Sequence, residues 1–133
     1  MTPAGEREAA MEEKGKKRLF SSYISKEISD VMEFLIRREE VSKVVFVRRA
    51  VRCFMETDRS IEPRLRITKR SDPDYVERGI LVTVYMEEET REQLKWAAQE
   101  QHCTLSQAFF QAILNYCAVL VSLDQSGMEI REE

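Results

Sequence analysis

The chain has 133 residues, of which 43% are hydrophobic, and its formal net charge is −3 at pH 7. These values indicate one small domain, or two very small ones, with a modest core, and they argue against a general nucleic-acid binder that relies on excess positive charge. No apolar run approaches the roughly 18 residues of a membrane span and the N-terminus is too polar for a secretory signal, so we expect a cytoplasmic protein without a membrane segment.

The first half of the chain reads as an arm followed by a strand and two helices. Residues 1–17 are polar and end in lysines, which predicts a flexible, basic-ended N-terminal arm. Residues 18–24 alternate in polarity and predict a short strand, and residues 26–39 place apolar side chains at helical spacing. Ser42 is a natural N-cap for a second helix, because its hydroxyl can accept a backbone N–H bond. That helix carries apolar side chains spaced i, i+3, i+4 and i+7, at Val47, Ala50, Val51 and Phe54.

The second half repeats this order. Residues 80–86 alternate as a strand, and residues 88–101 predict a helix, although its apolar pattern is weaker than in the first half. Thr104 is the N-cap candidate for a last helix, which runs on through a long apolar stretch. The helical spacing seen in the first half recurs here, at Phe109, Ala112, Ile113 and Tyr116.

The two halves correspond when the sequence is shifted by 62 residues. With this shift the two strands align and Ser42 aligns with Thr104, without a gap. Only 4 of 37 aligned positions are identical, so the halves resemble each other in the class of their residues more than in residue identity. We therefore divide the chain into a first unit, 18–57, and a second unit, 80–123. Residues 58–79, with two prolines, a glycine and many charges, are interpreted as a linker, and residues 124–133 as a C-terminal tail.

The sequence offers no set of residues for catalysis or metal binding. The three cysteines, Cys53, Cys103 and Cys117, lack metal-ligand spacing, and their odd number fits reduced thiols. His102 is the single histidine and has no plausible partner set. We therefore expect neither an enzyme nor a bound metal or cofactor.

Strand, helix, short turn and helix within about 40 residues resembles the ribbon-helix-helix family, the MetJ, Arc and CopG class of DNA-binding proteins. The resemblance rests on the strand alternation, the hydroxyl N-caps and the apolar-x-x-Ala-apolar-x-x-aromatic run, and it covers roughly 19–57 and 81–120. It implies a mainly α fold with a two-stranded antiparallel β-ribbon. Because two units lie in one chain, their strands are expected to pair with each other, as an intramolecular pseudo-dimer.

The resemblance also implies that the ribbon enters the major groove of double-stranded DNA, where base edges can be distinguished. The base-facing positions are then the outward side chains of the two strands: Leu19, Ser21, Tyr23, Leu81, Thr83 and Tyr85. Hydroxyls can donate or accept hydrogen bonds and leucine can contact a thymine methyl group. Family ribbons commonly use Arg, Lys, Asn or Gln on this face, and this chain has none there. The alternative is that the face packs against the linker, the N-terminal segment or another protein.

Phosphate contacts are expected from two places. In the family the N-terminus of the second helix points at the DNA backbone, and lysines before the first strand could form an arm on the phosphates. The residues concerned are Lys16, Lys17, Arg18, Ser42, Lys43 and Thr104. Residues 14–57 carry 11 basic and 6 acidic side chains, whereas residues 79–133 carry 3 basic and 9 acidic ones. We therefore expect the first unit to hold DNA more strongly than the second.

The last helix of the second unit differs from its counterpart at the surface. Three arginines of the first unit, Arg48, Arg49 and Arg52, are replaced there by Phe110, Gln111 and Leu114. Three kinds of cover remain open: the linker, the N-terminal segment, or another protein, including self-association with a second copy.

Two functions follow from the resemblance and from the way in which this chain departs from the family pattern. The first is a transcriptional regulator or a plasmid-transfer accessory factor, since some conjugation proteins carry two such units in one chain. The second is a protein-protein interaction module that keeps the fold but does not read DNA.

Overall fold

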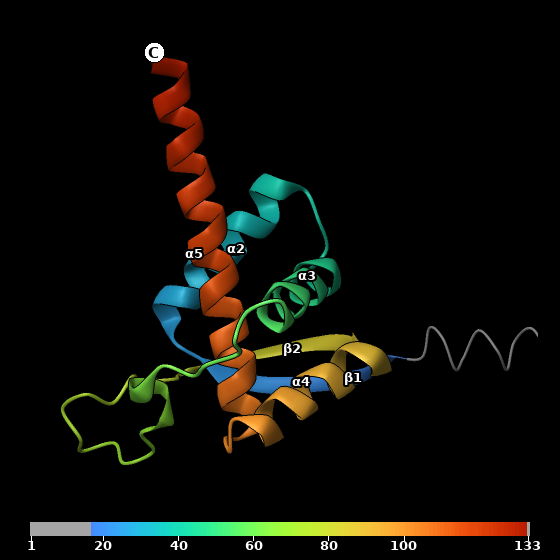
Figure 1. Ribbon diagram of the computed structural model, residues 1–133, viewed down its shortest axis with the longest axis vertical. Coiled ribbons are helices and arrows are strands. Elements are labelled where there is room, and N and C mark those ends of the chain that lie inside the picture. Colours follow the sequence, from blue (N-terminus) through green and yellow to red (C-terminus); the bar gives the residue numbers. More distant parts are fainter. Residues whose placement is uncertain (1–16, 133) are drawn as a thin grey trace, which may run out of the picture.

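The structure is a computed structural model, in which residues 17–132 of the backbone and residues 17–123 of the side chains are described. It is mainly helical, at 59%, with one two-stranded antiparallel sheet (Figure 1). The elements in chain order are β1 (Lys17–Ile24), α2 (Lys26–Glu39), α3 (Lys43–Met55), the short 3-10 helix η1 (Pro63–Arg66), β2 (Ile80–Glu87), α4 (Glu88–Glu100) and α5 (Leu105–Glu132). The predicted strands and first helices are thus correct to within one residue, and the mainly α class with a β-ribbon is confirmed.

The two strands pair with each other, as predicted from the repeat. The ladder runs from Lys17 opposite Glu87 to Ile24 opposite Ile80. Ser21 lies opposite Thr83 at its centre, and these two positions are 62 residues apart, the same offset that relates the two halves of the sequence. Exchanging the halves therefore maps the ladder between positions 18–24 and 80–86 onto itself, with the Ser21–Thr83 pair at its centre.

One face of the sheet forms the floor of the core. On β1 and β2, the side chains that face the helices are buried at six positions: Phe20, Ser22, Ile24, Val82, Val84 and Met86. The Phe20 ring packs against Phe109 of α5, with 4.9 Å between ring centroids. Alternate burial along both strands is what a sheet covered on one side requires, and it explains the period of two in the sequence.

The turn before the second helix is repeated in the two halves, whereas the first helices start differently, because α2 has a side-chain cap and α4 has none. The hydroxyls of Ser25 and Ser42 accept the backbone N–H of Ile28 and Val45, each at 3.2 Å, and cap α2 and α3. The turns before α3 and α5 place Glu40 and His102, 62 positions apart, in the left-handed region with φ of 55°. A side chain there crowds the following carbonyl group, so non-glycine residues are uncommon in this conformation.

Each half packs its helices onto the other half. Helix α3 lies against β2 and α4, and α5 lies against β1 and α2, while α3 and α5 pack together between them (Figure 1). Most of the fully buried side chains come from these contacts, including Phe46, Phe54 and Phe109. The described part of the chain therefore has one continuous core, and neither half encloses a core of its own.

The segment between the halves is folded against α5. Two apolar residues of this segment differ in burial: Leu65 is buried in η1, and Ile67 is partly exposed. The main-chain N–H of Glu62 donates to Oε1 of Gln111 on α5 at 2.7 Å. Arg78 holds the far end, since its guanidinium donates to the carbonyl groups of Leu65 and Ile67.

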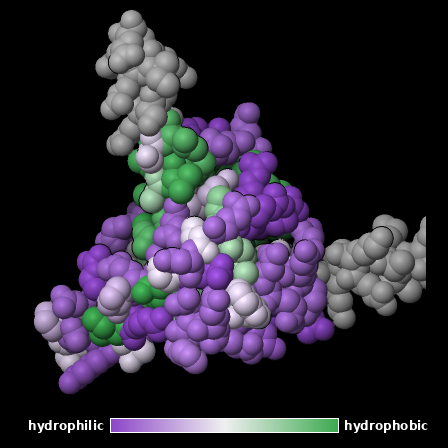
Figure 2. All heavy atoms as spheres, viewed as in Figure 1, coloured by the Kyte–Doolittle hydropathy of each residue, from purple (hydrophilic) through white to green (hydrophobic). Residues whose placement is uncertain are grey.

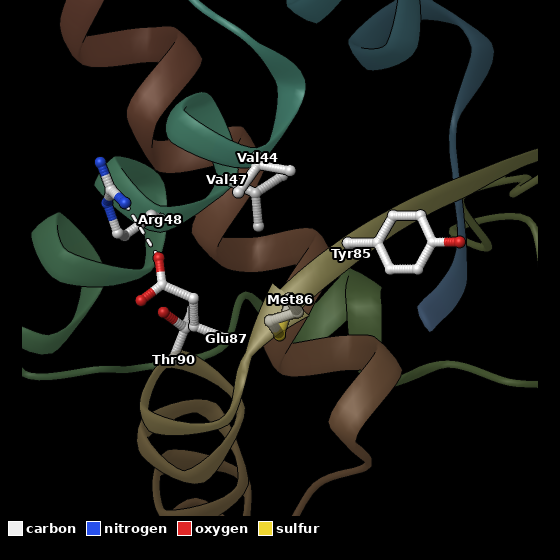
Figure 3. A pocket seen from close by; sticks show the side chains of 7 residues that line it. All are labelled: Val44, Val47, Arg48, Tyr85, Met86, Glu87 and Thr90. Atoms are coloured by element: carbon white, nitrogen blue, oxygen red, sulfur yellow. Dashed lines mark hydrogen bonds and ion pairs between the residues drawn. The ribbon is translucent and has the colours of Figure 1, made fainter. Parts of the chain in front are cut away.

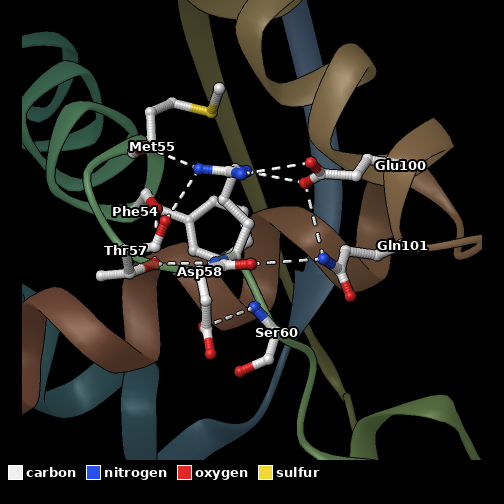
Figure 4. A network of polar contacts seen from close by, with 8 residues as sticks. Phe54, Met55, Thr57, Asp58, Ser60, Glu100 and Gln101 are labelled. Carbon is white, nitrogen blue, oxygen red and sulfur yellow. Dashed lines mark hydrogen bonds and ion pairs between the residues drawn. The ribbon is translucent and has the colours of Figure 1, made fainter.

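Arg59 ties the start of this segment to both halves (Figure 4). Its guanidinium donates to the carbonyl groups of Met55 and Thr57 at the end of α3, and it pairs with both carboxylate oxygens of Glu100, at 2.7 and 3.1 Å. Its guanidinium carbon also lies 5.1 Å from the centre of the Trp96 ring. The hydrogen bond from Arg59 lowers the pKa of Glu100 below its usual value.

Candidate nucleic-acid interface

The outward face of the ribbon is exposed along its whole length. The four large side chains of this face, Leu19, Tyr23, Leu81 and Tyr85, keep 58, 52, 50 and 58% of their surface exposed, and Ser21 and Thr83 between them are exposed as well. The described residues do not bury this face, so the alternative that the linker packs over it is not seen within residues 17–123. The six residues predicted to face DNA bases therefore lie together on one open surface; that they contact bases remains a prediction.

The side chains of this face are arranged symmetrically. The Ser21 Oγ and Thr83 Oγ1 atoms share a hydrogen bond of 3.0 Å at the centre. Leu19 lies opposite Tyr85 on one side of that pair, and Tyr23 lies opposite Leu81 on the other. The face therefore offers hydroxyls and apolar groups, with no charged side chain among these six.

At the Tyr85 end, the first turn of α3 meets the end of β2 (Figure 3). The Ser42 hydroxyl is exposed but serves as the helix cap, and Lys43 follows it, partly exposed, as the first residue of α3. Lys17 and Arg18 also lie at this end, because β1 starts where β2 stops. Four of the predicted phosphate residues are thus brought to one end of the ribbon, whereas Lys16 and the rest of the arm lie outside the described residues.

Acidic residues of the second unit share that end. Glu87 and Glu88 follow the last ribbon residues of β2, and Nε of Arg18 lies 3.5 Å from Oε2 of Glu88. Arg48 of α3 donates to Oε1 of Glu87 at 2.9 Å (Figure 3). Antiparallel pairing thus places the basic start of β1 beside the acidic end of β2 and the start of α4. These pairs reduce the positive charge available to phosphates, and the sequence analysis missed them.

At the Tyr23 end, the first turn of α5 takes the corresponding place. Thr104 Oγ1 accepts from the backbone N–H of Gln107 at 3.0 Å, and Oε1 of Gln107 accepts from the N–H of Thr104 at 2.9 Å. This reciprocal pair is a capping box, and it confirms Thr104 as the N-cap predicted for the last helix. The next hydroxyl, that of Ser106, is hydrogen-bonded to Ser22 under the ribbon.

The apolar last helix is covered in part by the linker. Phe110 and Gln111, which replace arginines of the first unit, are buried beneath the folded segment that contains Leu65. Farther along α5 the cover ends, and Val119 and Leu123 keep 45 and 63% of their surface exposed. Figure 2 shows apolar side chains gathered there, where α5 extends beyond the rest of the molecule. The helix continues to Glu132, through most of the segment that the sequence analysis set apart as a tail.

One stretch of α5, Leu105–Leu123, is long and apolar enough to cross a membrane by length and composition. The sequence analysis did not anticipate this because polar residues interrupt the stretch. Since 56% of it is buried inside the protein, it is consistent with the core helix of a soluble protein.

The cysteines are shielded to different degrees. Burial raises the pKa of the Cys117 thiol to about 11 and also raises that of Cys103. A raised pKa keeps these groups as thiols at neutral pH, which makes them poor nucleophiles and poor metal ligands. Within the described residues, no three His, Cys, Asp or Glu side chains are placed to hold a metal ion.

Comparison of the chain with protein-family models, with curated proteins and with solved structures found no match.

Proposed function

We propose that the chain is a tandem ribbon-helix-helix protein in which the two units form a pseudo-dimer. Support comes from features that recur at the 62-residue offset: the strand positions that pair at the centre of the ladder, the two left-handed turns, and the hydroxyl caps of α3 and α5. The crossed packing of each unit's second helix onto the other unit's strand supports the same arrangement.

On this basis we propose that the protein binds double-stranded DNA by placing the β1–β2 ribbon in the major groove. The observation that carries the proposal is the open outward face, with six side chains free to meet base edges. A two-stranded ribbon fits the major groove, and the hydroxyl pair at the centre with one Leu/Tyr pair on each side suits a site with two similar halves. The role would be that of a cytoplasmic transcriptional regulator or a plasmid-transfer accessory factor.

The test begins with selection of bound duplexes from a random pool. We expect a preferred site with two related halves, and an affinity that falls as salt rises. The variant Tyr23→Ala/Tyr85→Ala should stay folded, because both rings are exposed, and should lose most of the preference for the selected site.

The matched control is Phe34→Ala/Trp96→Ala. These two aromatic residues also lie 62 positions apart and are 54 and 51% exposed, but they belong to α2 and α4, away from the ribbon. The control should keep the wild-type site preference. Equal losses from both double variants, or no binding of wild type to any duplex at low salt, would contradict the proposal.

The second candidate is an interaction module, and the composition of the same face favours it. Leu19, Leu81 and the two tyrosines put four large, half-exposed side chains on the face of the ribbon, as surfaces that bind proteins often do, and none of the six predicted base-facing residues is a cation. The exposed end of α5 would add a contact for a second copy or a protein partner. Under this function, the tyrosine variant should lose a protein partner, and wild type should show no salt-dependent binding to mixed duplexes.

A further inference from the structure

An open hollow of about 550 Å³ lies beside the Tyr23 end of the ribbon. Tyr23 contributes to it from the proposed base-facing surface, and Ser106 contributes from the first turn of α5. Arg70, Tyr75 and Arg78 line it from the segment between the two units. The hollow is therefore continuous with the ribbon face.

The lining groups suit a phosphate. Arg70 is exposed and makes no hydrogen bond or ion pair with the described residues, so its guanidinium is available to an anion. The tyrosine hydroxyls nearby are further donors, whereas the Ser106 hydroxyl is already hydrogen-bonded to Ser22. Arginine binds phosphate through a planar set of N–H groups. Arg78 adds positive charge while its hydrogen bonds hold the linker in place. Glu77, also on the rim, opposes this charge.

Within residues 17–123, the opposite end of the ribbon is built differently. The corresponding space beside Tyr85 is lined by Val44 where the Tyr23 end has Ser106, and it has no room for a water molecule. Its arginine, Arg48, is engaged by Glu87. The linker, which supplies Arg70 to the first hollow, is a single segment and reaches one end.

We infer that the hollow beside Tyr23 holds one backbone phosphate of the bound duplex, and that it makes the protein bind its two-part site in one orientation. The inference rests on the proposed function, because a ribbon lying in the major groove has the phosphates of the groove walls at its two ends. The linker then contacts a phosphate at one end of the ribbon only. In a symmetric dimer of separate chains, the same contact would be made at both ends or at neither.

The experiment replaces single phosphates of the selected duplex by neutral methylphosphonates, one position at a time. Wild type should lose affinity for replacements near both ends of the ribbon. Arg70→Gln should become insensitive to one or two of these positions in one half-site alone, and the slope of log K against log salt should fall by about 0.9, the value for one phosphate.

The matched control is Lys69→Gln, which removes the same charge from the exposed neighbour of Arg70 that does not line the hollow. It should leave the pattern of sensitive positions unchanged. Glu77→Gln supplies a test of opposite sign, since it removes the opposing carboxylate and should tighten binding.

The outcomes separate this inference from the proposed function. If wild type binds no duplex, the function and the inference both fail. If wild type binds its site, yet Arg70→Gln and Lys69→Gln give the same pattern of sensitive positions, the inference alone is overturned. Circular dichroism of each variant checks that the fold is retained.

Discussion

The second helices of the two units, α3 and α5, begin alike and then differ. Both start after a left-handed turn and a hydroxyl cap, and both bury the same spaced set of side chains against each other. On the outer face, α3 keeps Arg49 and Arg52 exposed, whereas α5 places Phe110 and Gln111 under the linker. The residues that make the shared core keep their class, while the surface residues follow what covers them.

Of the substitutions that test this comparison, Phe109→Ala is expected to have the largest effect on the free energy of unfolding. Phe109 is fully buried against Phe20, so its truncation should lower the free energy of unfolding by about 3–5 kcal/mol. Val47 occupies the corresponding position of α3, and Val47→Ala removes fewer atoms and should cost less. Urea denaturation followed by circular dichroism measures both. Each variant should unfold in one transition, because the units share a core. Separate transitions for the two halves would contradict the shared core.

The linker's cover over α5 is tested by Leu65→Ala. Leu65 is 1% exposed, and its loss should cost about 2–5 kcal/mol, as for other buried leucines. Ile67→Ala, at a partly exposed position of the same segment, is the control and should cost less. Thermal unfolding measures the difference. Equal, small effects would mean that the segment is a tether and not part of the fold.

Substitutions at the two helix caps should have smaller effects on stability. Ser42→Ala and Thr104→Ala should each cost about 1 kcal/mol, because each leaves a backbone N–H of the first turn without its acceptor. Gln107→Ala should destabilise as well, since Gln107 completes the capping box of α5. The counterpart of Gln107 in α3 is Val45, whose side chain cannot form a hydrogen bond. Val45→Ala should therefore leave the cap of α3 intact, because only the backbone N–H of Val45 donates to Ser42. Urea denaturation of the four variants distinguishes the two helix starts.

The smallest effect concerns the pair formed by Arg59 and Glu100. The pKa of Glu100 is lowered in the folded protein, so its carboxylate stays ionised where the unfolded chain is protonated. The stabilisation is therefore complete above the ordinary value of 4.5 and is lost as pH falls through the lower folded pKa. Glu100→Gln should lower the melting temperature at pH 7, and this difference should shrink as pH falls below 4.5. An undiminished difference at pH 3 would exclude this ion pair as the cause.

Much of the fold could be predicted because its signals are local. A sheet covered on one side imposes a period of two, and Ser42 and Thr104 have a direct role at helix starts. The left-handed turns gave no such signal, since neither Glu40 nor His102 is a glycine or asparagine.

The remaining features depend on contacts between distant parts of the chain. The pairing of Arg48 with Glu87 follows only once the strand register brings α3 to the end of β2. The linker's cover of Phe110 could not be separated from cover by another protein, because an apolar surface looks the same in a sequence whatever lies on it. For the candidate site, the strand pattern was enough to predict which six side chains face outward, but not the balance of charge around them.

Both strands of the sheet belong to one polypeptide, and this affects how the protein responds to its own abundance. A sheet shared between two separate chains dissociates on dilution, because its assembly obeys mass action. Here β1 and β2 belong to the same chain, so the ribbon can form within one molecule at very low copy number, without a second chain.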